Sequence, residues 1–120
     1  MENRIIIIAT LKLVGNKLKE LQKTVMDLQS HCAKTEHGML QYDWYVSENS
    51  DTIKVLETYK NSEAVLFHFD NLKSFRERLS ESRTFVSLEV YGKASDALKE
   101  RVKKINAAHF TAISYLNKLT

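Results

Sequence analysis

Three side chains near the middle of the chain, those of Glu57, Tyr59 and His68, are of types that can transfer a proton. Residues alternate between apolar and polar up to Tyr59, which places Glu57 and Tyr59 on one face of a predicted strand. Apolar residues then recur with helical spacing, and His68 falls on the helix face expected to pack against that strand. Such a histidine suits a general base, with Glu57 orienting its ring and Tyr59 donating to a developing oxyanion. A hydrogen-bonded core histidine would leave the same pattern, so both interpretations stay open.

Three aromatic residues are expected close to this group. Tyr42 and Trp44 alternate on the strand predicted before Glu57, and Phe75 follows His68 on the same helical stripe. Aromatic rings form walls against planar substrates, and they are equally typical of core packing. We therefore expect substrate contacts from Tyr42, Trp44 and Phe75, with core packing as the alternative.

The elements that would position these side chains follow the order β-α-β-β-α-β. Alternation predicts strands over residues 4–13, 39–46, 52–59 and 84–91, and helical spacing predicts helices after the first and third strands. Four side chains are expected to cap helices, namely Asn16, Ser62, Asn71 and Ser95. The order is that of an α+β, ferredoxin-like split βαβ unit over residues 4–91. An extension over residues 93–120 would add a helix and an extra strand at 107–116.

The first strand indicates a second protein layer. Residues 5–8 are four consecutive isoleucines, so both faces of this strand must be covered. A chain with so few helices can cover only one face by itself. We therefore expect a homodimer formed through the sheet.

Composition excludes several classes of function. With 120 residues the chain is expected to form one domain, over residues 1–120. The net charge is +3, but the basic run at 99–104 contains no aromatic residue, so we expect no nucleic-acid partner. The apolar block near the start is too short for a membrane span or a signal peptide, which predicts a cytoplasmic protein without membrane contacts.

The sequence contains no pattern typical of a cofactor or metal site. The single cysteine, Cys32, lies on an apolar helical stripe and is expected to be a core residue. The four histidines fall on different elements without ligand spacing, and no glycine-rich loop precedes a helix. We expect neither a cofactor nor a metal.

Three short motifs surround the residues that can transfer a proton. They are Gly38-x-Leu40-x-Tyr42, Leu56-Glu57-x-Tyr59 and Asn61-x-Glu63-Ala64-x-x-x-His68. Phe75 and Phe110 match aromatic positions that follow in the same pattern. Together these motifs resemble the antibiotic biosynthesis monooxygenase superfamily, over roughly residues 4–91.

The resemblance implies a dimeric α/β barrel, in which two ferredoxin-like protomers pack sheet against sheet and the last strand often crosses to the partner. It implies a monooxygenase that needs no cofactor and oxidises quinols or polyketide-like phenols with His68 as base. An isomerase of a small keto-phosphate has the same elements, and a non-catalytic ligand-binding dimer would use the same pocket. Haem degradation is not expected, because His68 occupies the tryptophan position of that branch and Asn3 precedes the first strand.

Overall fold

The chain forms a five-stranded sheet with its helices packed on one face. The computed structural model describes residues 3–116. The elements are β1 (Ile5–Leu13), α1 (Leu18–Thr35), β2 (Met39–Val46), β3 (Thr52–Tyr59), α2 (Ser62–Asn71), the 3₁₀ helix η1 (Leu72–Phe75), α3 (Arg76–Ser80), β4 (Arg83–Tyr91), α4 (Asp96–Val102), the 3₁₀ helix η2 (Lys103–Ile105) and β5 (Ala108–Phe110). The strand order is β2-β3-β1-β4-β5, with β1 antiparallel to both β3 and β4. This topology confirms the predicted ferredoxin-like α+β fold.

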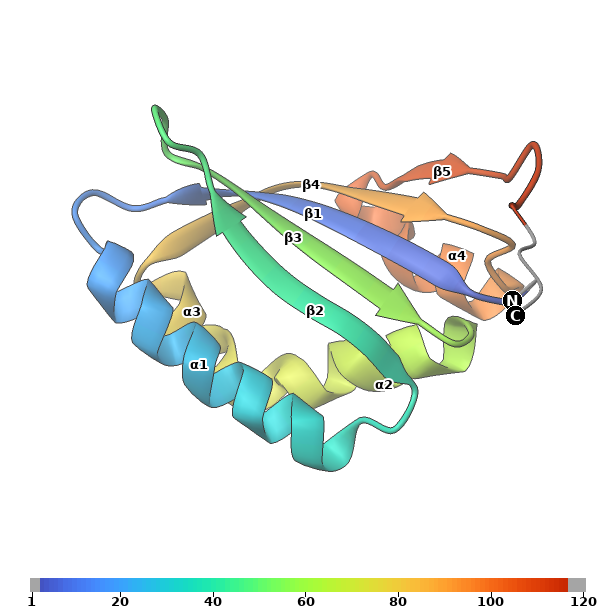
Figure 1. The fold of residues 1–120 in the computed structure, drawn as a ribbon, viewed down its shortest axis with the longest axis horizontal. Helices are drawn as coiled ribbons and strands as arrows, with labels where there is room; N and C mark the ends of the chain where they lie inside the picture. The colour runs from blue at the N-terminus through green and yellow to red at the C-terminus, as the bar shows by residue number, and fades with distance from the viewer. Residues whose placement is uncertain (1–2, 117–120) are drawn as a thin grey trace.

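Within residues 3–116, the helices cover one face of the sheet and leave the other without a covering layer. Figure 1 shows α1, α2 and α3 together beneath the sheet, and α4 lies next to the start of α2. The isoleucines of β1 reflect this asymmetry, since Ile5 and Ile7 are fully buried against the helices while Ile6 and Ile8 on the opposite face are only partly buried. None of the described helices has the length and apolar character needed to cross a membrane.

The start of α2 differs from the prediction by one residue. Asn61, not Ser62, caps the helix, because its side-chain oxygen accepts a hydrogen bond from the backbone N–H of Ala64 at 2.9 Å. The Ser62 hydroxyl instead accepts from the backbone N–H of Ser95 at 3.0 Å and so connects α2 to α4. The predicted cap at Ser95 is confirmed, since its hydroxyl accepts from the N–H of Leu98.

Two further predicted caps are wrong. Lys17, without a side-chain bond to the helix, precedes α1 in place of Asn16. Asn71 gives no capping bond to η1, because its amide donates to Thr35 and Glu36 at the end of α1. The helical segment is interrupted after Asn71, where η1 follows α2 directly and leads into α3.

The extra strand is shorter than expected. β5 covers only three residues of the predicted 107–116 and pairs in parallel with β4. Phe110 stacks on Tyr91, with ring centroids 4.8 Å apart, on the open face of the sheet. The last residues of the predicted extension, 117–120, lie outside the described residues.

A shift in register explains why the second strand exposes an apolar residue. We expect Leu40, Tyr42, Trp44 and Val46 to share one face, but the pairing of β2 with β3 shifts between Met39 and Gln41. Leu40 lies in this bulge and is 63% exposed, whereas Tyr42 is buried against the helices.

Gly38, the first residue of the glycine motif, marks a close approach between the chain entering β2 and the first turn of α2. A Cβ atom at Gly38 would lie only 2.6 Å from the Cβ atom of Ala64. The absence of a side chain at Gly38 therefore allows the two segments to pack this closely at Ala64.

We predict that Gly38→Ala lowers the free energy of unfolding by about 1–3 kcal/mol, through overpacking against Ala64. Adding Ala64→Gly should recover part of this loss, although that change alone costs up to about 1 kcal/mol of helix stability. Urea unfolding of the two single variants and the double variant measures the coupling. Simple additivity of the two losses would contradict the close approach.

Candidate active site

His68 is held in place by Glu36, a residue that the sequence patterns do not single out. The Nδ1 atom of His68 lies 2.8 Å from Oε2 of Glu36, and the two side chains are 1% and 2% exposed. Glu36 directly follows α1, and the side-chain amide of Asn71 donates to the same oxygen at 2.9 Å. Because a carboxylate accepts this bond, Nδ1 carries the proton and Nε2 remains available to act as a base.

Glu36 is an ionised carboxylate in this arrangement. Burial by itself would raise its pKa, but the hydrogen bonds donated by His68 and Asn71 outweigh burial and hold the pKa below its usual value. Glu36 is 32 residues from His68 in the chain and follows the last turn of α1, where no apolar spacing marks a buried carboxylate. Sequence reasoning missed it for that reason.

Glu57 and Tyr59 lie on the sheet opposite the imidazole, as predicted. Oε1 of Glu57 is 3.9 Å from Nε2 of His68, and the Tyr59 hydroxyl donates to the same oxygen at 2.5 Å. Burial raises the pKa of Glu57 above its usual value, against the opposing influence of His68 and Tyr59. Burial also raises the pKa of Tyr59, with a further contribution from Glu57, so the phenol remains a donor. The hydrogen bond that orients the ring is the one that Nδ1 of His68 donates to Glu36, and not a bond to Glu57, which faces Nε2.

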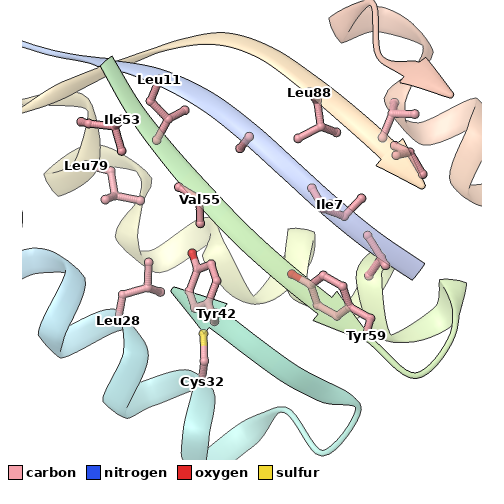
Figure 2. Close-up of a cluster of buried hydrophobic side chains, with 14 of the residues drawn as sticks. Ile7, Leu11, Leu28, Cys32, Tyr42, Ile53, Val55, Tyr59, Leu79 and Leu88 are labelled. Atoms are coloured by element: carbon pink, nitrogen blue, oxygen red, sulfur yellow. The ribbon is translucent and has the colours of Figure 1, made fainter. Parts of the chain in front are cut away.

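A cavity of about 270 Å³ between the sheet and the helices reaches this group. Its lining is largely apolar and includes six residues with polar atoms, namely Tyr42, Trp44, Glu57, His68, Arg76 and Arg83. Tyr42 lies edge-on to the imidazole with ring centroids 4.8 Å apart, and Trp44 lies edge-on to Tyr42 at 6.1 Å. Figure 2 shows the Tyr42 ring standing between β2 and β3, in the layer that Tyr59 enters from the end of β3.

The lining of the cavity does not include Phe75 or Tyr59. Phe75 ends η1, and its ring lies 5.5 Å from that of His31 and beneath the guanidinium of Arg78. The 3₁₀ turn has about three residues per turn, so it rotates Phe75 out of the stripe that His68 occupies. Tyr59 is fully buried. Its hydroxyl donates to Glu57, and its ring lies 5.7 Å from the ring of His68.

A larger groove lies elsewhere on the molecule. It has a volume of about 380 Å³ between α1 and β2 and includes Val25, Met26 and Tyr45 in its lining, but no carboxylate or imidazole. The smaller cavity is the better candidate for chemistry, because it combines an apolar wall with titratable groups.

Cys32, Glu36 and His68 form a buried cluster whose types can bind a metal ion. Their potential ligand atoms lie within 4.8 Å of one another, which the sequence analysis did not anticipate. Burial raises the pKa of the Cys32 thiol well above its usual value, with a further contribution from Glu36, so the thiol stays protonated. In this state Glu36 serves as an acceptor for its neighbours, and a metal ion would have to displace the proton on His68 Nδ1.

The sequence and the fold that carry this site are similar to those of known proteins. A family model described as antibiotic biosynthesis monooxygenase matches residues 4–77. No curated protein matches the sequence. MupZ from Pseudomonas fluorescens has a similar structure, with 17% identity, a TM-score of 0.86 and coverage of 97% of this chain and 95% of that one.

Two other solved structures cover 78% of the chain each. A candidate antibiotic biosynthesis monooxygenase from Caulobacter crescentus CB15 is 26% identical, with a TM-score of 0.67 over 78% of this chain and 92% of that one. SnoaB from Streptomyces nogalater, described as a cofactor-independent oxygenase, is 8% identical, with a TM-score of 0.65 over 78% of this chain and 95% of that one.

The raised pKa of Glu57 predicts a specific pH dependence of stability. Above pH 4.5, the usual pKa of a glutamate, the folded protein retains a proton on Glu57 that the unfolded chain releases. The contribution of Glu57 to the free energy of unfolding therefore falls as pH rises toward the pKa of the folded state. We predict that Glu57→Gln removes this loss of stability with rising pH. The free energy of unfolding of the variant, relative to wild type, should therefore rise with pH, by at most about 1.4 kcal/mol per pH unit.

Urea unfolding between pH 4.5 and 8 measures this difference. Glu63→Gln, which removes an exposed carboxylate of α2, is the matched control. Parallel pH profiles for wild type and Glu57→Gln would contradict the burial effect on Glu57.

Proposed function

The chain belongs to the antibiotic biosynthesis monooxygenase family, and we propose that it oxidises a small aromatic phenol or quinol with molecular oxygen and without a cofactor. The observation that carries the proposal is the cavity lined by His68, Glu57, Tyr42 and Trp44. Its volume of about 270 Å³ suits a small planar ring. The similar fold of SnoaB, described as a cofactor-independent oxygenase, supports the same reaction class.

The first step is removal of a proton from the substrate. A phenolic hydroxyl, or an acidic C–H beside a carbonyl, would approach the Nε2 atom of His68, which takes the proton. Glu36 then stabilises the imidazolium through the bond to Nδ1, in a site shielded from water. The tautomer imposed by Glu36 is the one that a base at Nε2 requires.

Oxygen then reacts with the electron-rich anion. One electron passes from the substrate to O₂, and the resulting radical and superoxide combine to form a carbon–oxygen bond. The resulting peroxide anion takes up the proton from His68 to become a hydroperoxide. The hydroperoxide then loses water to leave a carbonyl, so a CH₂ group and O₂ become C=O and H₂O. All electrons come from the substrate, which is why this reaction needs no separate reductant. The protein supplies the base, the apolar walls and hydrogen-bond donors for the developing negative charge.

We also propose that two copies of the chain pack through the open face of the sheet. Ile8 and Leu56 lie directly opposite each other on neighbouring strands of this face. Tyr91 and Phe110 extend the apolar surface to the far edge, and Val86 on β4 is 56% exposed. An apolar sheet face of this kind is best covered by another sheet, and an identical copy supplies one.

The base is tested with two substitutions. His68→Asn keeps an amide donor near the position of Nδ1 but lacks Nε2, so the bond to Glu36 can persist while the base is lost. We predict that oxygen uptake with 1,4-dihydroxynaphthalene or anthrone, corrected for uncatalysed oxidation, falls by about 10²- to 10⁴-fold in His68→Asn. His37→Ala, which removes an exposed imidazole, should keep wild-type activity.

Unchanged uptake in His68→Asn would refute the role of His68. Turnover of a keto-phosphate without oxygen consumption would instead identify the protein as an isomerase that uses the same base. Wild-type protein that neither consumes oxygen nor turns over any of these compounds would refute the enzymatic proposal and favour a ligand-binding dimer.

The dimer is tested by a charge placed on the open face. We predict that Ile8→Lys converts a dimer to a monomer in light scattering coupled to size exclusion, because two buried lysines would face each other without partners. Phe67→Lys is the control, since Phe67 is 50% exposed on α2 and lies on the helical side. Circular dichroism checks folding of both variants, and a monomeric wild type would refute the interface.

A further inference from the structure

Two buried N–H donors of the cavity have no acceptor. Trp44 and Arg83 both line the cavity that reaches His68. The Nε1 atom of Trp44 and the Nε atom of Arg83 are shielded from solvent, and no acceptor of the described residues is in hydrogen-bond geometry with either atom. The Tyr42 phenol is a polar group near both. Buried donors are nearly always satisfied in native proteins, so two orphans in one cavity need a physical explanation.

The charges around these donors are also unbalanced. Arg76 and Arg83 line the same cavity, and within residues 3–116 neither has a carboxylate within salt-bridge distance. Arg76 donates only to the backbone oxygen of Phe69, at 3.2 Å. Burial lowers the pKa of Arg83, and the positive charge of Arg76 lowers it further. A partly buried guanidinium without a counter-ion is costly, and an anion beside it would remove that cost.

The two observations concern the same part of the cavity. Arg83 begins β4, and Trp44 lies on β2 next to Tyr42, whose phenol interacts with both of them. An indole N–H donates a single bond in the plane of its ring, whereas a guanidinium presents a planar fork. Together they match an oxygen-rich anionic group, which accepts several hydrogen bonds at once.

We propose that the cavity binds an oxyanion substituent of its ligand, a carboxylate or a phosphate, through Arg83 and Trp44. The proposal builds on the proposed function, because the same ligand would present its reacting hydroxyl to His68. It narrows the substrate class from phenols and quinols in general to those that carry an acidic group. Arg83 and Trp44 then act as specificity-determining residues, and His68 transfers the proton.

Binding of matched ligands under nitrogen tests this proposal without any turnover. The probes are 1,4-dihydroxynaphthalene, the same quinol with a 2-carboxylate, and 1-naphthyl phosphate. Trp44 is the single tryptophan of the sequence and lines both the cavity and the groove between α1 and β2, so its fluorescence reports binding at either place. Calorimetry gives independent Kd values, and the effect of the Arg83 variants assigns the binding to the cavity, because Arg83 lines only the cavity of these two. We expect the carboxylated quinol to bind about 10- to 100-fold more tightly than the uncharged quinol.

Three variants identify the donors. Arg83→Gln should abolish the preference for the carboxylate while changing the Kd of the uncharged quinol by less than about threefold. Arg83→Lys keeps the charge without the fork and should retain only part of the preference. Trp44→Phe keeps an aromatic wall without the N–H and should reduce the preference in calorimetry. Lys23→Gln, which removes one positive charge on the exposed side of α1, is the control and should behave as wild type.

The outcomes separate this proposal from the monooxygenase reaction. Equal binding of the charged and uncharged quinols, equal weakening of both by Arg83→Gln, or no binding of any probe would overturn the oxyanion site. Tight binding of the phosphate that depends on Arg83, without tight binding of the carboxylate, would identify phosphate as the natural group. A preserved preference in a protein that consumes no oxygen would overturn the monooxygenase reaction alone.

Discussion

The buried pair of Glu36 and His68 is the interaction on which the rest of the site depends. It joins the end of α1 to the inner face of α2, and Asn71 ties the same carboxylate to the end of α2. Loss of one partner from such a pair typically costs about 3–5 kcal/mol, because the other partner is left buried without compensation. Replacement of both by apolar residues often costs nothing, so stability alone gives little reason to keep the pair. Its value lies in fixing which nitrogen of the imidazole faces the sheet.

With Nδ1 of His68 bound to Glu36, Nε2 faces the sheet and links the helical layer to it. Nε2 of His68 points toward Glu57, whose carboxyl group is held by Tyr59 and has a pKa raised by burial. Two carboxyl groups on opposite sides of one imidazole therefore have pKa values shifted in opposite directions. Glu36 remains ionised and orients the ring, while Glu57 holds a proton more readily. Carboxyl groups whose pKa values are shifted apart in this way are typical of sites that perform acid and base chemistry.

Around this group the core departs from simple apolar packing. Most of the layer between sheet and helices is aliphatic, as the side chains around Leu28, Val55 and Leu79 in Figure 2 show. The polar exceptions with unmet hydrogen bonds include Trp44 and Arg83, which line the same cavity as His68. Local departures from good packing and full hydrogen bonding tend to concentrate where a protein binds or reacts. The open face of the sheet, in contrast, carries an apolar patch around Ile6, Ile8 and Leu56, bordered by polar side chains such as Lys54 and Glu89.

The sequence by itself determined the elements and the faces of the sheet, because both follow from periods of two and 3.6 residues along the chain. It placed Glu57 and Tyr59 on one strand face and His68 on the helix facing them, and the structure confirms this arrangement. Only the tertiary structure showed Glu36 as the partner of His68, since the pairing joins residues 32 positions apart. The turn at η1 similarly rotated Phe75 away from the cavity. The folded sheet brought Trp44 of β2 and Arg83 of β4 to the lining of one cavity, although β3 and β1 lie between their strands. Such contacts depend on how elements pack in three dimensions, which no local period records.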